Sequence, residues 1–188
     1  MSLGHSLICG KNAIREWILH HCPTQSRILD MGAGGGTYAD LLHGLSYIID
    51  AVEIHDAAIP VLVNKYHSVF HMDLRDFTFF QDYDLVIMGD VLEHLNTNDA
   101  QQVVKNILQH SKWLLVAVPF NYPQDPEVEN PAEEHLQPDL NFTTVKQRYP
   151  ELELLLFIRN NTELIHLSDG SPYTIDYAYY IAKGALNE

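Results

Sequence analysis

The chain has 188 residues, 46% of them hydrophobic, which excludes a disordered protein and suits one domain, residues 1–188, with a sizeable core. Its formal net charge of -14 would repel phosphate backbones and anionic headgroups, so neither nucleic acid nor a membrane is an expected partner. Two cysteines exclude a disulfide framework, and the chain shows no signal-like leader or apolar run of bilayer length, so a cytoplasmic protein is predicted.

Helices and strands alternate along the first two thirds of the chain. An amphipathic helix is predicted over 11–22, because Ile14, Trp17 and Ile18 recur at helical spacing, and Pro23 ends it. Buried strands are then predicted at 27–31, 46–54, 68–74, 83–89 and 112–120, with helices between them at 36–45, 55–66 and 98–111. This alternation indicates a parallel sheet covered by helices on both faces.

Two of these helices contain residues that bear on their boundaries. Pro60 is expected to interrupt the helix over 55–66, because proline lacks the N–H that an interior helical position needs. Asn98 or Asp99 is expected to cap the helix at 98–111, since both side chains accept hydrogen bonds from free backbone N–H groups.

The character of the chain changes after Phe120. Residues 121–140 are rich in proline and acid and are predicted to form a long loop, a kind of segment that often serves function. A helix over 141–150 is expected to start near Asn141 or Thr143. Apolar strands at 152–161 and 173–184, separated by the turn signal "SDGSP", are expected to pair as an antiparallel hairpin. The predicted fold class is therefore α/β: a doubly wound, mostly parallel, seven-stranded Rossmann-like sheet with an antiparallel C-terminal strand pair.

A glycine-rich turn follows the first predicted strand. The segment "LDMGAGGG" reads Asp-x-Gly-x-Gly-x-Gly from Asp30 to Gly36, at the point where a nucleotide approaches the backbone in such folds. A dinucleotide fingerprint would need glycine where Thr37 stands, and Asp30 would repel a pyrophosphate. The turn therefore favours a ligand with an ammonium group, held directly or through water.

Acidic residues end the next strands at the same edge of the sheet. Glu53 ends the second strand, at the distance past the glycines where an acid binds ribose hydroxyls in nucleotide-binding folds. Asp73 follows the third strand and could accept from an adenine amino group. Gly89 and Asp90 end the fourth strand at this rim.

Together these segments resemble the class I S-adenosylmethionine-dependent methyltransferases. The resemblance rests on "LDMGAGGG", "VEI", "MDL", "YDLVIMGDVLEHL" and "LLVAVP", in order and with suitable spacing between Ile28 and Pro119. It implies S-adenosylmethionine as the cofactor and a binding role for Asp30, Gly32, Gly34, Gly36, Glu53, Ile54, Asp73, Leu74, Gly89 and Asp90. In it Asp30 orients the amino group, the glycines let the methionine part pass, and Glu53 holds the ribose.

Each acid also has a simpler interpretation. Asp30 could be a solvent-facing cap, Glu53 a surface charge at a strand end, and Asp73 a turn residue in competition with Asp76. Glu93 and His94 are more typical of residues that cap or pack the next helix than of a proton relay or a metal site. No pair of histidines one helical turn apart occurs on a convincing helix, so no metal is expected.

His135 is the candidate catalytic residue. It lies in the loop over 121–140, which in this fold runs over the methyl-bearing end of the cofactor, and a histidine suits a general base for an oxygen or nitrogen acceptor. The alternative is a solvated loop histidine, with Asn121 and Tyr122 lining the acceptor pocket instead.

The sequence therefore predicts methyl transfer from S-adenosylmethionine to an unidentified acceptor, most simply a small molecule. Acceptor specificity is expected to come from the N-terminal helix region, 1–22, and from the loop over 121–140. A scaffold or regulatory protein that binds the cofactor without turnover is the alternative, and a nicotinamide dehydrogenase is disfavoured by Asp30 and Thr37. The oligomeric state is left open.

Overall fold

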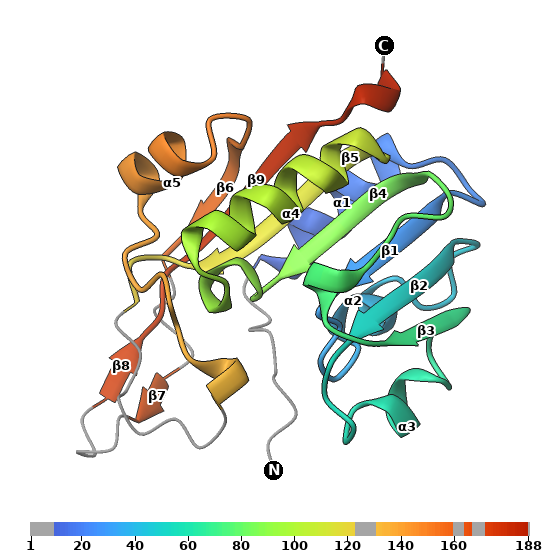
Figure 1. Ribbon diagram of the computed structural model, residues 1–188, viewed down its shortest axis with the longest axis horizontal. Coiled ribbons are helices and arrows are strands. Elements are labelled where there is room, and N and C mark those ends of the chain that lie inside the picture. Colours follow the sequence, from blue (N-terminus) through green and yellow to red (C-terminus); the bar gives the residue numbers. More distant parts are fainter. Residues whose placement is uncertain (1–9, 123–130, 160–163, 167–171, 188) are drawn as a thin grey trace.

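The structure is a computed structural model that describes residues 10–122, 131–159, 164–166 and 172–187. Its centre is a seven-stranded sheet with the strand order β3-β2-β1-β4-β5-β9-β6 (Figure 1). The strands are β1 (Arg27–Met31), β2 (Ile48–Glu53), β3 (Ser68–His71), β4 (Tyr83–Gly89), β5 (Ser111–Pro119), β6 (Glu153–Ile158) and β9 (Tyr177–Lys183). The first five strands pair in parallel, whereas β9 is antiparallel to both β5 and β6. The predicted fold class is confirmed.

The strand order reverses between β1 and β4. From β1 the chain builds outward through β2 to β3, and it then returns to the other side of β1 to form β4. In open α/β sheets such a reversal opens a crevice beyond the carboxyl ends of the two strands, because the flanking connections leave on opposite faces. The glycine-rich turn after β1 lies at that reversal.

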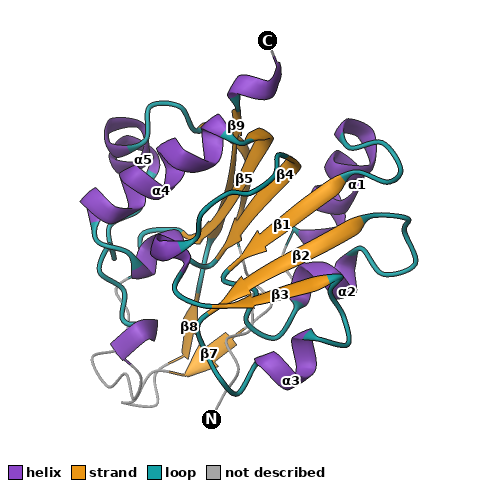
Figure 2. Ribbon diagram, turned by 45° about the vertical axis from the view of Figure 1, so that its right-hand side comes forward, coloured by secondary structure: helices purple, strands orange, loops and turns teal. Residues whose placement is uncertain are grey.

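Helices cover both faces of the sheet (Figure 2). Side chains of α1 (Lys11–His21), α2 (Thr37–Leu41) and α3 (Ile59–Leu62) pack into one core cluster, and those of α4 (Thr97–Gln109) and α5 (Phe142–Arg148) pack into the other. Strand β4 serves both, since Leu85 and Ile87 face the first cluster while Val86 and Met88 face the second. A strand buried on both faces explains the continuous apolar run that predicted it.

Two expected helix boundaries were wrong. Pro60 does not interrupt α3 but lies in its first turn, where the missing N–H has no intrahelical partner to lose. The cap of α4 is Asn96, whose side chain accepts from the backbone N–H of Asp99 at 3.0 Å. Asn98 and Asp99 lie inside the helix instead. The expected start of α5 near Asn141 or Thr143 is confirmed, and Asn141 caps the helix, because its side chain accepts from the backbone N–H groups of Thr143 and Thr144.

The connection between β6 and β9 is longer than a simple hairpin. It contains a second, two-stranded antiparallel sheet of β7 (Leu164–His166) and β8 (Pro172–Thr174), which the sequence did not predict. Most of the expected "SDGSP" turn, residues 168–171, lies outside the described residues. None of the helices in the described ranges combines the length and apolarity that crossing a bilayer would need.

Candidate active site

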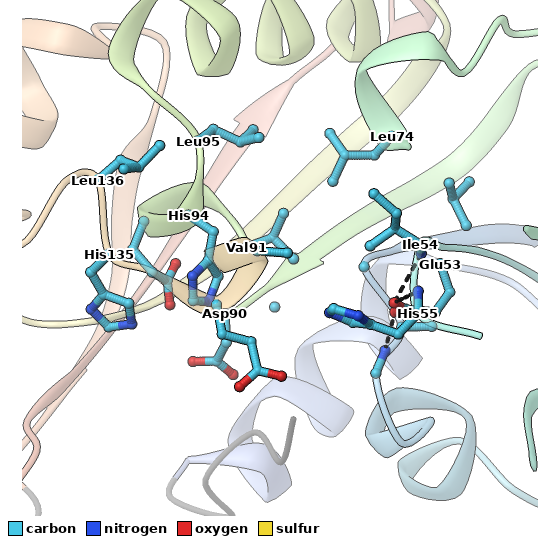
Figure 3. A pocket seen from close by; sticks show the side chains of 18 of the residues that line it. Glu53, Ile54, His55, Leu74, Asp90, Val91, His94, Leu95, His135 and Leu136 are labelled. Carbon is cyan, nitrogen blue, oxygen red and sulfur yellow. Dashed lines mark hydrogen bonds between the residues drawn. The ribbon is translucent and has the colours of Figure 1, made fainter. Parts of the chain in front are cut away.

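A cavity of about 530 Å³ opens beyond the carboxyl ends of β1, β2 and β4. This volume is within the range of roughly 300–1,000 Å³ that is usual for small-molecule sites. Figure 3 shows Glu53 and His55 on one side of the cavity, His94 and His135 on the other, and Asp90 between them. Nine of the eleven predicted site residues line it, namely Gly32, Gly34, Glu53, Ile54, Asp73, Leu74, Gly89, Asp90 and His135.

Glu53 is buried and holds the backbone of the glycine turn. One carboxylate oxygen accepts from the N–H of Gly34 at 2.7 Å, and the other accepts from the N–H groups of Ile54 and His55, each at 2.9 Å. Its exposed fraction is only 3%, which excludes a surface charge. With two acceptor positions on each oxygen, one position remains, so binding both ribose hydroxyls would displace one of these N–H groups.

Two glycines are required by close contacts between the strand ends. Gly32 has a φ of 80°, and a Cβ there would lie 2.4 Å from the nearest methyl carbon of Val91, just beyond β4. A Cβ on Gly89 would lie 2.3 Å from the ring of Tyr38, at the start of α2. The backbone of β1 and β4 can therefore approach its neighbours closely only because these positions carry no side chain. Asp90, the next residue, has a positive φ of 57°.

Asp30 and Gly36 do not line the cavity. Asp30 is 1% exposed, which excludes a solvent-facing cap, and its carboxylate accepts from the hydroxyl of Tyr66 at 2.5 Å. Burial raises the pKa of Asp30 to about 6, while the Tyr66 hydrogen bond and the charge of Lys11 oppose the rise. Gly36 is the cap of α2 and faces the side chains of Leu62 and Lys65.

Asp73 behaves as the turn residue that the alternative interpretation described. It caps the short helix η1 (Leu74–Asp76), because its carboxylate accepts from the backbone N–H of Arg75 at 2.8 Å. The guanidinium of Arg75 binds the same carboxylate, with Nε at 3.0 Å, and lowers the pKa of Asp73. Beside it, Ile54 and Leu74 line the cavity, and Ile54 is 46% exposed, so this end offers apolar contact for a planar ring.

The opposite end of the cavity contains Glu93, His94 and His135. One potential ligand atom from each lies within 4.8 Å of the other two. The rings of His94 and His135 meet edge to face with their centroids 4.9 Å apart, and the ring of Tyr122 approaches His135 at 5.4 Å. Burial lowers the pKa of His135 to about 4, with a smaller contribution from His94. A base of that pKa accepts a proton weakly at neutral pH, which weakens the predicted general-base role.

Gln137 fastens the loop of His135 to the end of β4. Its side-chain N–H groups donate to the carbonyls of Leu92 and Leu95 at 2.9 and 3.0 Å, and its backbone N–H donates to the carbonyl of Glu93 at 3.0 Å. Its side-chain oxygen accepts from the hydroxyl of Tyr149 at 2.8 Å. With an exposed fraction of 2%, this amide explains how residues far apart in sequence meet at one site.

Sequence reasoning missed three residues that shape the site. The sequence does not mark Gln137 as a site residue, because a single glutamine in an acidic, proline-rich loop is expected to be exposed to solvent. Lys11, at the start of α1, is 3% exposed, lies 3.9 Å from the ring centre of Tyr38, and feels the charges of Asp90 and Asp30. Tyr66 reaches Asp30 from beyond α3. Only the folded chain reveals these contacts, since none of the three residues belongs to a spaced motif.

Several solved structures share this fold. TehB from Haemophilus influenzae is 17% identical with a TM-score of 0.66, and the match covers 92% of this chain and 62% of that one. An S-adenosylmethionine-dependent methyltransferase from Clostridium acetobutylicum ATCC 824 is 13% identical, with a TM-score of 0.64 and coverage of 92% and 89%. Magnesium protoporphyrin IX methyltransferase from Synechocystis PCC 6803, solved with bound SAM, is 13% identical, with a TM-score of 0.60 and coverage of 92% and 78%.

At these identities the structural matches show the fold alone. A search of curated proteins by sequence gives no significant match. The family described as "Methyltransferase domain", however, matches residues 10–166 by its sequence profile. Because that match spans well over half of the chain, the protein belongs to the methyltransferase domain family, and its resemblance to the class I S-adenosylmethionine-dependent methyltransferases is confirmed.

Proposed function

We propose that the protein transfers a methyl group from S-adenosylmethionine to a small-molecule acceptor. The observation that carries the proposal is a single cavity that joins the Glu53 end to the His135 end, with Asp90 between them (Figure 3). The cofactor fills the first end and the acceptor the second. A donor and an acceptor held in one cavity react as a unimolecular pair, which removes most of the entropic cost of their encounter.

The cofactor end supplies complementary groups for each part of the molecule. The ribose hydroxyls lie against Glu53, and the adenine ring lies between Ile54 and Leu74, beside Asp73. The methionine part passes over Gly32 and Gly34, with Gly89 and Asp90 on its sulfonium side and Gly36 shaping the turn from behind. Asp30 attracts the ammonium group from beneath the turn through its charge, since it does not line the cavity.

The acceptor end has an apolar wall and a polar floor. Leu95 and Leu136 line it (Figure 3), and Leu136 is 50% exposed, so an apolar or aromatic body finds contact there. His135, His94 and Glu93 supply the polar atoms. The loop over 121–140 would select the acceptor, although residues 123–130 lie outside the described part of the chain. The chain's net charge of -14 argues against a nucleic-acid acceptor.

A thermal melting experiment tests the cofactor class. S-adenosylhomocysteine at about a hundred times its dissociation constant should stabilise the fold by about 2.7 kcal/mol. For a domain of this size the melting temperature should then rise by roughly 5–10 °C. NAD at the same concentration should give no rise, because a pyrophosphate would meet the negative charges of Asp30 and Glu53. A rise with NAD alone would overturn the proposal.

A further inference from the structure

We propose that Glu93, His94 and His135 bind one divalent transition-metal ion at the acceptor end of the cavity. The three side chains come from two segments, the turn after β4 and the loop that follows η3 (Pro131–Glu133). Figure 3 shows His94 and His135 close together across the cavity from Glu53. One carboxylate and two imidazoles form a common donor set for catalytic zinc and for other first-row metals, with positions left open for water or substrate.

The spacing of the donor atoms suits a small ion after modest closure. They lie within 4.8 Å of one another. Bonds of about 2.0–2.2 Å to a tetrahedral zinc ion would place them roughly 3.3–3.6 Å apart. Rotation about side-chain torsions, with donor atoms closing by at most about 1.5 Å, therefore completes the site without moving the backbone.

Glu93 supplies an independent reason to expect a cation. Its side chain is 1% exposed, and its Oε2 atom has no hydrogen-bond partner among the described residues. Burial raises the pKa of this carboxyl well above its usual range, and the neighbouring charge of Asp90 raises it further. A buried carboxylate with an unpartnered oxygen is costly, and proteins normally offset that cost with a paired charge or a coordinated metal. A metal ion between Glu93 and the two histidines would supply that charge.

His94 is already oriented as a metal ligand. Its Nδ1 lies 3.2 Å from the carbonyl oxygen of Glu134. A carbonyl oxygen can only accept, so Nδ1 carries the hydrogen and, in the neutral imidazole, Nε2 carries the lone pair. Metal-binding histidines commonly make this second hydrogen bond to a backbone carbonyl, because it fixes both tautomer and ring orientation.

A metal ion at this site would restrict the chemical class of the methyl acceptor. This inference rests on the proposed function. A divalent ion at this position would bind an acceptor hydroxyl and lower its pKa, so that the proton passes to solvent water at neutral pH. The oxygen then forms its bond to the methyl carbon as the carbon–sulfur bond breaks, and the electron pair of that bond stays on sulfur. The preferred acceptors are hydroxyl compounds able to chelate a metal, with an apolar body that contacts Leu95 and Leu136.

Titration of the metal-free protein with zinc chloride is the primary test. We expect one Zn²⁺ per chain by calorimetry, and Co²⁺ in its place should give visible absorption bands of a four- or five-coordinate site. Glu93→Gln, His94→Ala and His135→Ala should each weaken Zn²⁺ binding by at least about a hundredfold, because losing a ligand costs no less than losing an outer-shell partner. His43→Ala is the matched control, since His43 is exposed beyond the end of α2 and does not line the cavity.

S-adenosylhomocysteine affinity is measured on the same proteins. It should change by less than about threefold in all four variants, which also shows that they are folded. If wild-type protein binds S-adenosylhomocysteine but takes up no stoichiometric Zn²⁺, Co²⁺ or Mn²⁺, the metal site is wrong and the methyltransferase proposal stands. The metal site is also wrong if Zn²⁺ binds to wild type but the three variants retain it. If the metal binds as expected and S-adenosylhomocysteine does not, the cofactor proposal fails instead.

Discussion

The two ends of the cavity are built in different ways. The cofactor end is made by strand tips that pair in parallel, and Glu53 ties the tip of β2 to the glycine turn after β1 through backbone N–H groups. The acceptor end is made by one turn and one long loop that share no strand pairing, and the buried amide of Gln137 fastens them together. The first depends on sheet register, the second on a few side-chain hydrogen bonds.

This difference implies that a substitution at one end of the cavity can abolish ligand binding there without affecting ligand binding at the other end. A substitution in the loop should weaken binding of the metal and the acceptor but leave cofactor affinity unchanged, because the sheet continues to position the strand tips. A change at Glu53 should disturb the glycine turn and therefore the cofactor, with no effect on the fastening of the loop. Sites more than about 7–10 Å apart with no shared partners usually contribute additively. Measuring both ligands on each variant tests this separation.

The largest effect is expected for Glu53→Ala. The substitution removes the acceptor of three backbone N–H groups in a buried site, so the free energy of unfolding of the cofactor-free protein should fall by roughly 3 kcal/mol or more. Affinity for S-adenosylhomocysteine should fall ten- to hundredfold, which corresponds to about 1.5–3 kcal/mol. Urea denaturation and calorimetric titration measure the two quantities, and Zn²⁺ affinity should stay unchanged.

Two further variants sharpen this prediction. Glu53→Gln should lower stability and cofactor affinity by an intermediate amount. The amide oxygen can still accept from a backbone N–H, but the amide nitrogen cannot, and it would face at least one of the N–H groups that now donate to the carboxylate. Asp56→Ala is the control, since its side chain is 94% exposed near the same strand end. A Glu53→Ala protein that is as stable as wild type would mean that the turn does not depend on this carboxylate.

Gln137→Leu should have the next largest effect and should act on the other end. It removes the hydrogen bonds from the Gln137 amide to the carbonyls of Leu92 and Leu95 and the one from the Tyr149 hydroxyl to Gln137, at a cost of about 2–3 kcal/mol, although the Leu92 carbonyl keeps the backbone N–H of Leu95. Zn²⁺ affinity should fall about tenfold or more, because His135 is no longer held beside His94. Affinity for S-adenosylhomocysteine should change by less than about threefold.

The same substitution on the surface of α4, Gln102→Leu, serves as the control because Gln102 is exposed. It should leave stability and both affinities nearly unchanged. Equal loss of both ligands in Gln137→Leu would show that the two ends of the cavity are coupled and do not fail independently.

The smallest effect is expected from the titration of Asp30. Its pKa is raised from 3.8 to about 6, so folding favours the neutral form, and the stability that this group contributes is lost as pH rises from about 4 through 6. The cofactor's ammonium group favours the charged form. Between pH 7 and pH 5 the charged fraction falls about tenfold, and wild-type affinity for S-adenosylhomocysteine should fall by about the same factor.

Asp30→Asn should bind more weakly at pH 7 and lose this dependence on pH. Its cofactor-free form should gain stability over wild type above pH 6 and lose that advantage near pH 4. Lys11, Tyr66 and Glu53 are the ionisable groups acting on Asp30, and all three are retained in the variant. An equal slope of affinity against pH in both proteins would assign the dependence to another group.

Local and periodic signals in the sequence determined the sheet and one end of the site. Apolar runs of strand length predicted all seven strands of the main sheet, and the antiparallel pairing of the last two was expected correctly. Glycines and acids lie immediately after these strands, and the carboxyl ends of parallel strands share one edge. Nine predicted residues could therefore be placed at one cavity without any knowledge of side-chain contacts.

Only the tertiary structure decided which hydrogen-bond partners those residues have and which residues line the opposite end of the cavity. Glu53 is a buried acceptor of backbone N–H groups, and Asp73 is bound by Arg75, because neighbouring turns supply donors that spacing does not reveal. His135 lies beside Glu93 and His94 because Gln137 reaches the carbonyl of Leu92 across 45 residues of chain. Such a contact has no period and no fixed spacing, so it becomes visible only when the loop is folded against the sheet.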